Sequence, residues 1–436
     1  MPLIAIVGRP NVGKSTLFNR VTRSRKAITA PEPGVTRDRH MSEAEWQGRA
    51  FLMMDTGGWV PHSEDLFETA IREQVQFALE ECDFVLFIGD AHTGPTDVDL
   101  SIARLLQRGD KPVVLAVNKT DGPKQDLETG EFYAMGLGDP LPVSAVSGRG
   151  VAELLDYVVE RLPEQGAAEE LSRPRPLVAV VGRPNVGKSS FVNAVVGKPQ
   201  RVVTEIAGTT RDAADTVVGY YRQQLTLIDT AGLRRRSRIG EAVEFYTTVR
   251  TDRALRDCDV AVVLTDAERG VVGQDIRILQ QAEELGKGML LCVNKWDLVE
   301  KDARTADKLH REIRERYASL SYVPVMFISC LEQQRVFKVL EQVIRIHEER
   351  QKRISTPELN RFVGDLMETA PPPSVKGRDI RFHYVTQVSA EPPQFVFWTG
   401  HPDLVAENYQ RYLDRRIREQ YGFEGVPVRI AFRKKT

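Results

Sequence analysis

Two stretches of the sequence have the residue types and spacing of a phosphate-binding loop. Gly8–Ser15 reads GRPNVGKS between an apolar run and a helical pattern, and Gly182–Ser189 repeats all eight residues. The glycines let successive backbone N–H groups point at phosphate, and the next helix adds its positive N-terminal end. The lysine supplies a cation for the outer phosphates, and the serine hydroxyl supplies a ligand for Mg²⁺. The predicted phosphate-site residues are Gly8, Asn11, Gly13, Lys14, Ser15 and Thr16, and in the second copy Gly182, Asn185, Gly187, Lys188, Ser189 and Ser190.

A D-x-x-G tetrapeptide ends a strand-like run roughly 40 residues after each loop, at Asp55–Gly58 and Asp229–Gly232. Such an acid can hold Mg²⁺ through water, while the glycine N–H senses the γ-phosphate. A threonine in the loop after the first helix can close on Mg²⁺ only when the γ-phosphate is present. Thr36 and Thr210 align there, with Thr209 as a neighbouring candidate. The predicted Mg²⁺ ligands are therefore Ser15, Thr36, Asp55, Ser189, Thr210 and Asp229, and the predicted γ-phosphate contacts are Gly58 and Gly232.

The motif N-K-x-D predicts which base is bound. A carboxylate accepts both the N1–H and the N2 amino protons of guanine, whereas adenine would leave that carboxylate unpaired. A Ser-Ala or Ser-Cys pair follows the next strand, where backbone can meet the guanine O6. Because the second of these loops lacks the glycines of the first, we expect it to be less regular. The predicted base-site residues are Asn118, Lys119, Asp121, Ser144 and Ala145, and in the second copy Asn294, Lys295, Asp297, Ser329 and Cys330.

The order of these motifs indicates one domain duplicated. The offset between the copies is 174 residues at the phosphate loop (182 − 8), 176 at N-K-x-D (294 − 118) and 185 at the serine pairs (329 − 144). Near-continuous apolar strands alternate with helical patterns in both copies, which predicts α/β domains with doubly wound, mostly parallel sheets. The expected strands are Leu3–Val7, Ala50–Met54, Phe84–Gly89 and Val113–Asn118, then Leu177–Val181, Gln224–Ile228, Val260–Thr265 and Met289–Asn294.

Composition and punctuation set the domain limits. We expect one nucleotide domain at 1–162, a polar, proline-punctuated linker at 163–176, a second nucleotide domain at 177–350 and a small α/β domain at 351–436. The formal net charge of -1 leaves nucleic-acid contact to local patches. The four cysteines predict reduced structural residues rather than a disulfide framework. No stretch has the roughly 20 apolar residues of a membrane span.

The last domain has a different character. It carries 14 Lys/Arg against 10 Asp/Glu, a net of +4 (14 − 10). We expect strands at 380–388, 394–399 and 426–432 and a helix at 403–420. Gly422–Gly425 has the form G-x-x-G, which in KH domains joins two helices and clamps RNA. Here it lies between the last helix and the last strand, where Gly422 is typical of a helix C-cap. The domain could therefore dock on the two nucleotide domains and read their state instead of contacting RNA.

Taken together, two GRPNVGKS loops, two N-K-x-D motifs and a small C-terminal domain resemble the Der (EngA) family of bacterial double-Era-like GTPases. The likeness covers essentially the whole chain, including Pro371–Gly377, Phe395–Thr399, Tyr409–Arg411 and Tyr421–Pro427. It implies a cytoplasmic, ribosome-associated GTPase that binds GTP and GDP with Mg²⁺ and acts in assembly of the large ribosomal subunit. It also implies a KH-like domain with rRNA or the subunit precursor as partner. We expect a monomer with no membrane association.

One departure concerns the attacking water. Ras-type enzymes orient it with a glutamine directly after D-x-x-G, but Trp59 and Leu233 stand there. The resemblance implies that a K⁺ ion supplies the missing charge, with Asn11 and Asn185 as its ligands. With Lys14, Thr36, Lys188 and Thr210, these residues form the predicted catalytic set. Alternatively, the asparagines only cap the loop.

Two further points stay open. The basic run at 234–238 could grip rRNA phosphate in one nucleotide state, or be a solvated or interdomain charge run. A nucleotide-sensing RNA scaffold with one inactive site is a competing hypothesis, although both copies keep the same Lys, Ser, Thr and Asp set. Roles in tRNA modification or membrane trafficking would need a catalytic module or a membrane anchor, and we find neither in the sequence.

Overall fold

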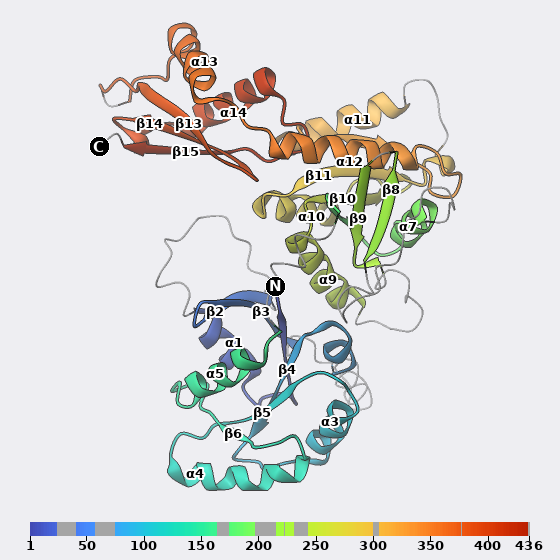
Figure 1. The fold of residues 1–436 in the computed structure, drawn as a ribbon, viewed down its shortest axis with the longest axis vertical. Coiled ribbons are helices and arrows are strands. Elements are labelled where there is room, and N and C mark those ends of the chain that lie inside the picture. Colours follow the sequence, from blue (N-terminus) through green and yellow to red (C-terminus); the bar gives the residue numbers. More distant parts are fainter. Residues whose placement is uncertain are drawn as a thin grey trace. The chain divides into compact units, whose positions relative to one another are not determined.

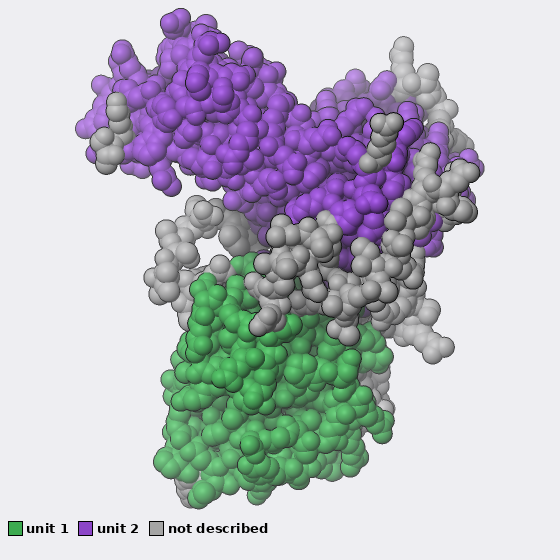
Figure 2. All heavy atoms as spheres, in the orientation of Figure 1, with its two compact units in different colours: residues 1–171, 238–249 green, residues 172–237, 250–436 purple. Residues whose placement is uncertain are grey.

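The computed structural model describes residues 1–23, 41–56, 75–163, 174–196, 215–221, 223–230, 243–299, 305–375 and 377–434. The chain forms two compact units (Figure 2): residues 1–171 with 238–249, and residues 172–237 with 250–436. Several predicted features lie outside the described residues, namely Thr36, Gly58, Trp59, Thr209, Thr210, Gly232, Leu233 and the basic run at 234–238.

The first repeat is built on a six-stranded sheet with the order β2-β3-β1-β4-β5-β6 (Figure 1). β2 is antiparallel to β3, and the other neighbours are parallel. The strands are β1 (Leu3–Val7), β2 (Met41–Trp46), β3 (Arg49–Asp55), β4 (Phe84–Asp90), β5 (Val113–Asn118) and β6 (Leu141–Pro142). The helices are α1 (Lys14–Arg23), α3 (Asp97–Gln107), α4 (Pro123–Glu128), the 3₁₀ helix Thr129–Met135 and α5 (Val151–Arg161).

Side chains of β1 alternate between two apolar cores, one on each face of this sheet. Leu3, Ala5 and Val7 belong to one core, and Ile4 and Ile6 belong to the other. A strand buried on both faces needs apolar residues at every position, which is why β1 reads as one apolar run. The carboxyl ends of the parallel strands therefore meet at one edge, where doubly wound sheets bind ligands.

The second repeat has the same topology, with the sheet order β12-β11-β10-β7-β9-β8. β8 is antiparallel to β9, and the other neighbours are parallel. The strands are β7 (Leu177–Val181), β8 (Thr216–Tyr220), β9 (Gln223–Ile228), β10 (Val260–Asp266), β11 (Gly288–Asn294) and β12 (Val325–Phe327). The helices are α7 (Lys188–Val196), α9 (Val243–Asp257), α10 (Gly273–Glu284), α11 (Thr305–Arg316) and α12 (Val336–Gln351), with 3₁₀ turns at Trp296–Leu298 and Ala318–Leu320. All eight strands predicted in the two repeats agree with the structure to within one residue at each end.

The C-terminal domain is a three-stranded sheet with the order β13-β14-β15 and two long helices. β13 and β14 are antiparallel, and β14 and β15 are parallel. Its elements are α13 (Thr356–Thr369), β13 (Phe382–Ala390), β14 (Pro393–Thr399), the 3₁₀ helix Pro402–Leu404, α14 (Glu407–Tyr421) and β15 (Arg429–Lys434). Its apolar core is continuous with one face of the second repeat, because Val178 and Phe423 belong to a single buried cluster.

Three elements predicted for this domain have wrong boundaries. The expected strand at 380–388 lies at Phe382–Ala390, two residues later at each end. The expected helix at 403–420 begins at Glu407, because Val405 is extended (φ -72°, ψ 111°) and separates α14 from the preceding 3₁₀ helix. The expected strand at 426–432 begins at Arg429. Val426 belongs instead to the turn after α14, where Arg418 Nη1 donates to its carbonyl oxygen at 2.9 Å.

Candidate functional site

The first phosphate-type loop joins β1 to α1 at the carboxyl edge of the sheet. Gly8 has φ 147° and Gly13 has φ 99°, both in the region that favours glycine. A Cβ on Gly8 would lie 2.5 Å from Ile88 O, and a Cβ on Gly13 would overlap Asn118 Nδ2. Only glycine therefore fits at either position.

The second loop repeats this geometry between β7 and α7. Gly182 has φ 141° and Gly187 has φ 99°. A Cβ on Gly182 would overlap Leu264 O, and one on Gly187 would overlap Asn294 Nδ2. At the two glycine positions of each copy, the backbone of the loop passes too close to its neighbours for any side chain.

The lysine of each loop is folded back into it. Lys14 Nζ donates to Gly8 O at 2.7 Å and to Arg9 O at 2.9 Å, and Lys188 Nζ donates to Gly182 O at 2.5 Å and to Arg183 O at 2.7 Å. Both side chains are buried. Burial lowers the pKa of Lys14 to about 8, against the opposing effect of nearby Asp55. A buried ammonium inside a loop of N–H groups is an anion site in both copies.

The two loop asparagines share one unusual conformation. Asn11 and Asn185 both have φ 65°, and both are exposed. Among the residues that the structure describes, neither side chain makes a hydrogen bond that would cap its loop. The K⁺ assignment stays a prediction.

The acids of the D-x-x-G segments lie at the same edge. Asp55 ends β3 and is 3% exposed. Asp229 directly follows β9 with φ 55°, and its N–H donates to Asp215 Oδ1 at 3.0 Å. A serine hydroxyl at the start of a helix and a strand-end carboxylate are oxygen donors of the kind Mg²⁺ takes alongside water and phosphate oxygens. The described part of each site thus fits the ion, and the threonine of each set lies outside the described residues.

Asn118 joins two loops at the first base site. Its Nδ2 donates to Val12 O at 2.7 Å, and its Oδ1 accepts from Ala145 N at 2.8 Å. This asparagine therefore ties the phosphate loop to the loop after β6. We expected the Ala145 N–H to meet the guanine O6, but it donates to Asn118 Oδ1 instead. Next to it, Asp121 Oδ1 accepts from Ser144 Oγ at 2.5 Å.

The second base site has the same bridge. Asn294 Nδ2 donates to Val186 O at 2.8 Å, and Cys330 N donates to Asn294 Oδ1 at 3.0 Å. Within the described residues, the buried Oδ1 of Asp297 accepts no hydrogen bond. A buried carboxylate oxygen without a donor is costly, and the paired N–H groups of guanine would satisfy it. Burial, with Asp297 nearby, raises the pKa of Cys330 to about 12, so this thiol stays neutral.

The expectation that the second base loop is less regular was wrong. Gln333 (φ 55°) and Arg335 (φ 58°) adopt the left-handed conformations that Gly148 (φ 91°) and Gly150 (φ 70°) take in the first copy. The Ser329 N–H donates to Gln334 O at 3.2 Å and closes the same turn. Side chains at these positions add backbone strain without changing the path of the loop.

Sequence reasoning missed two charge pairs in each copy. Lys119 Nζ lies 2.5 Å from Asp90 Oδ2, and Arg9 Nε lies 3.0 Å from Asp99 Oδ2. Lys295 with Asp266 (2.6 Å) and Arg183 with Asp275 (2.8 Å) repeat them. The first pair holds the N-K-x-D loop, and the second holds the phosphate loop. Both acids recur at an offset of 176 residues (266 − 90 and 275 − 99), which is the signal that could have found them.

The G-x-x-G segment of the C-terminal domain lies against the second repeat. Phe423 is fully buried, and Glu349 Oε2 of α12 accepts from its N–H at 2.7 Å. Gly425 accepts from Met289 N at 2.7 Å and donates to Tyr322 O at 2.8 Å. The segment therefore docks one domain on another, and its backbone is not presented as an RNA clamp.

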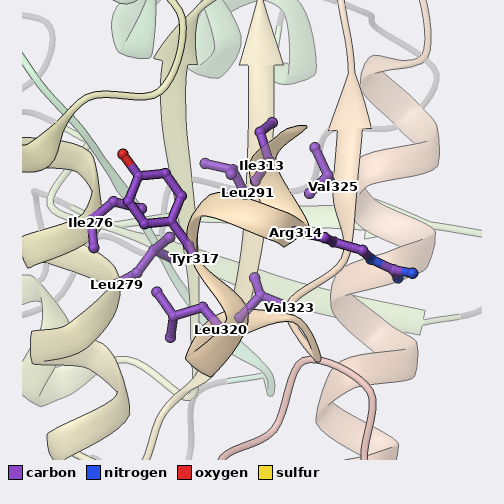
Figure 3. Close-up of a pocket in the computed structure, with 9 residues that line it drawn as sticks. All are labelled: Ile276, Leu279, Leu291, Ile313, Arg314, Tyr317, Leu320, Val323 and Val325. Atoms are coloured by element: carbon purple, nitrogen blue, oxygen red, sulfur yellow. The ribbon is translucent and has the colours of Figure 1, made fainter. Parts of the chain in front are cut away.

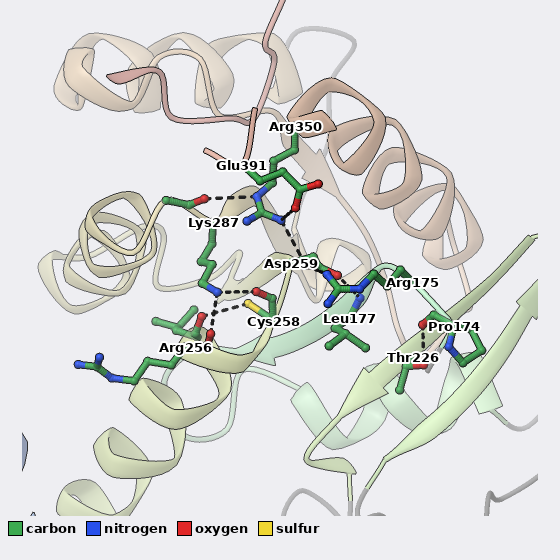
Figure 4. A network of polar contacts seen from close by, with 12 residues as sticks. Pro174, Arg175, Leu177, Thr226, Arg256, Cys258, Asp259, Lys287, Arg350 and Glu391 are labelled. Carbon is green, nitrogen blue, oxygen red and sulfur yellow. Dashed lines mark hydrogen bonds and ion pairs between the residues drawn. The ribbon is translucent and has the colours of Figure 1, made fainter. Parts of the chain in front are cut away.

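A polar network lies at the same junction (Figure 4). Arg350 of α12 reaches Asp259 Oδ1 at 3.2 Å and Glu391 Oε2 at 3.4 Å. Asp259 also pairs with Arg175 at 2.8 Å and accepts from Leu177 N at 2.9 Å. One carboxylate at the start of β10 thus connects the incoming chain, the second repeat and the C-terminal domain.

The hollow in Figure 3 is lined by Arg314, Tyr317 and apolar side chains of α10, α11, β11, β12 and the segment between α11 and β12, and it belongs to the core of the second repeat. All four cysteines are buried and free, as predicted. No helix among the described residues is long and apolar enough to cross a membrane.

Two family models match parts of this chain. A family model described as "50S ribosome-binding GTPase" matches residues 3–119 and 177–295. A model described as "KH-domain-like of EngA bacterial GTPase enzymes, C-terminal" matches residues 353–433. A solved structure of Era in complex with MgGDPNP and a 16S ribosomal RNA fragment aligns with 60% of this chain and 93% of its own, at 21% identity and a TM-score of 0.31.

Two curated relatives match along the whole chain. GTPase Der of Chlorobium phaeobacteroides is 47% identical over 100% of both chains, and GTPase Der of Porphyromonas gingivalis is 46% identical over 99% of both. The predicted resemblance and fold class are thereby confirmed. The chain belongs to the Der family of GTPases, GTP-hydrolysing enzymes with two GTPase domains and a KH-like C-terminal domain.

Proposed function

We propose that this GTPase acts in assembly of the large ribosomal subunit and binds rRNA of that subunit or its precursor. The observation that carries the proposal is the pairing of two intact phosphate and base sites with a KH-like domain in one chain. The description of the matching GTPase family, "50S ribosome-binding GTPase", supports the choice of subunit. We further propose that the protein is a cytoplasmic monomer.

At each site, the loop and its lysine would bind the phosphates. Lys14 and Lys188 are buried ammonium groups surrounded by loop backbone, and they would neutralise charge that develops on the γ-phosphate. Asp121 and Asp297 would select guanine by accepting its two N–H donors. Asn118 and Asn294 would act by holding the phosphate and base loops together, since both of their amide ends are engaged by backbone.

Mg²⁺ would be held at each site by the serine that follows the lysine, by the strand-end acid through water and by the switch threonine. These residues are Ser15, Thr36 and Asp55 at the first site and Ser189, Thr210 and Asp229 at the second. The ion would neutralise phosphate oxygens. The protein side chains would orient the nucleotide and exclude water.

K⁺ would complete the charge around the phosphates. Support comes from the exposed loop asparagines Asn11 and Asn185, whose side chains make no hydrogen bond among the described residues, and from the hydrophobic residues Trp59 and Leu233 at the position of a water-orienting glutamine. Hydrolysis should be faster in KCl than in NaCl, and equal rates would refute the use of K⁺.

We also propose the domain limits 1–162, 177–350 and 351–436, with the linker at 163–176. The two sheets and the C-terminal sheet each lie within one of these ranges, which supports them. Limited proteolysis should cleave first in the linker. Early cleavage inside one of the three domains would contradict the limits.

The decisive experiment is co-sedimentation with separated ribosomal subunits, in GDP and in a non-hydrolysable GTP analogue. We expect binding to the large subunit or its precursor in the GTP-analogue state. Binding that is absent, or identical in both nucleotides, would overturn the assembly role. Lys14→Ala and Lys188→Ala, each assayed for turnover, would identify a scaffold with one inactive site if either substitution left the rate unchanged.

A further inference from the structure

We propose that Arg20 is a positioning residue for guanine binding at the first site, and that the second site lacks this support. The proposal rests on the base-site assignment made above. Arg20 lies on α1, and its Nε donates to Ala145 O at 2.6 Å while its Nη2 donates to Val146 O. One guanidinium thus holds two consecutive carbonyls of the base loop.

The backbone N–H and the backbone carbonyl of Ala145 are therefore both hydrogen-bonded to side chains. Its N–H is held by Asn118 at 2.8 Å, and its carbonyl is held by Arg20. A second arginine of the loop, Arg149, makes a bidentate pair with Asp126 (2.6 Å for each contact) and donates to Thr120 O at 3.1 Å. The base loop is thereby tied to the phosphate-loop helix on one side and to the N-K-x-D loop on the other.

Neither arginine exists in the second copy. Ala194 stands at the position of Arg20 (20 + 174), and Gln334 stands at the position of Arg149 (149 + 185). A second residue change accompanies the replacement of Arg20 by Ala194. A Cβ on Gly148 would lie 2.7 Å from Arg20 Nη1, and the equivalent residue in the second copy is Gln333 (148 + 185). The guanidinium end of Arg20 lies where a side chain on residue 148 would begin, and the copy that lacks the arginine also lacks the glycine.

The second site stiffens its base loops by a different means. Trp296 is buried, and its ring centroid lies 4.5 Å from that of Phe327. These residues replace Thr120 (120 + 176) and Pro142 (142 + 185) of the first copy. Packing of these two rings therefore supports the second N-K-x-D loop. No arginine among the described residues holds the carbonyls of its base loop as Arg20 does in the first copy. Preorganised loops release ligands more slowly, so the contacts of Arg20 should slow nucleotide release from the first site alone.

The test measures release of a fluorescent GDP analogue from one site at a time. Asp297→Asn removes guanine recognition at the second site, and Asp121→Asn removes it at the first, so each background should bind one nucleotide per chain. In the Asp297→Asn chain, Arg20→Ala should accelerate release about tenfold, the loss of roughly one charge-assisted hydrogen bond. Arg20→Lys should fall between, because an ammonium lacks the planar fork. Asn19→Ala, on the same exposed helix face, is the control and should leave release unchanged.

The reciprocal test places an arginine and a glycine at the equivalent positions of the second copy. In the Asp121→Asn chain, Ala194→Arg combined with Gln333→Gly should slow release from the second site, while Arg20→Ala there should have no effect. A role for Arg20 in folding alone would predict no gain from the transplant. The proposal would be refuted if neither Arg20→Ala nor the combination of Ala194→Arg with Gln333→Gly changed the release rate of its parent chain. A chain with Asp297→Asn that still binds two nucleotides would instead refute the base-site assignment, and stoichiometry separates these two failures.

Discussion

Replacing Asn118 by alanine should loosen the first GTPase domain more than any exposed substitution of the same type. The side chain is 3% exposed, and it joins Val12 O to Ala145 N across more than 100 residues of chain. Alanine would leave one buried carbonyl and one buried N–H without a partner. Each such group costs about 1–3 kcal/mol, so for the two groups we expect a loss of about 2–6 kcal/mol in the free energy of unfolding of this domain.

The assay should resolve the domains, because a chain with several domains has no single free energy of unfolding. Hydrogen exchange along a urea series, read peptide by peptide, reports each domain separately. Asn19→Ala is the matched control, since Asn19 Nδ2 makes one exposed hydrogen bond, to Ser15 O at 2.7 Å. Asn294→Ala should produce the same loss in the second domain and spare the first. If Asn118→Ala and Asn19→Ala shift the first domain equally, the bridge contributes nothing and the reasoning is wrong.

Three other outcomes are expected. Gly13→Ala should abolish nucleotide binding at the first site, measured by titration with a GDP analogue, whereas Gly130→Ala, where a Cβ meets nothing within 4 Å, should not. Because the pKa of Lys14 is lowered to about 8, its ammonium is lost as pH rises past that value. Nucleotide affinity at the first site should then fall between pH 7 and 9.5, and a flat profile would contradict the assignment. The same shift means that the folded state releases this proton before the unfolded state does, so its contribution to stability rises with pH from about 8 to 10.5. Arg350→Met should weaken docking of the C-terminal domain by about 2–4 kcal/mol, seen as faster exchange in β13 and β14, while Arg345→Met, at an exposed pair, should change it little.

Much of the fold and of the chemistry could be predicted from local sequence. A phosphate loop is short, and its glycines, lysine and serine act within eight residues, so the pattern is complete in the sequence itself. Strands such as β1 and β7 are buried on both faces and therefore appear as unbroken apolar runs. The duplication multiplied each signal, because every motif recurs at a slowly increasing offset.

Contacts between distant segments could not be predicted in this way. The G-x-x-G segment has the letters of an RNA clamp, yet Phe423 is buried and its N–H donates to Glu349 of α12, while Gly425 pairs with Met289. The second base loop lacks glycines, yet Gln333 and Arg335 take the same backbone path. In both cases the surrounding packing decides the conformation, and a local pattern carries no information about what packs on it.

The sequence alone therefore determined what each site binds, because phosphate and guanine are recognised by residue types at short, regular spacing. Tertiary structure decided how each site is held. Asn118 reaches Val12 and Ala145, and Arg20 reaches the same base loop from α1. The contacts Asn118–Val12 and Arg20–Ala145 each span more than 100 residues of chain, and their existence depends on how the sheet brings its carboxyl ends together. The two copies share the chemistry of their ligands, and they differ in the side chains that keep the ligand-binding loops in place.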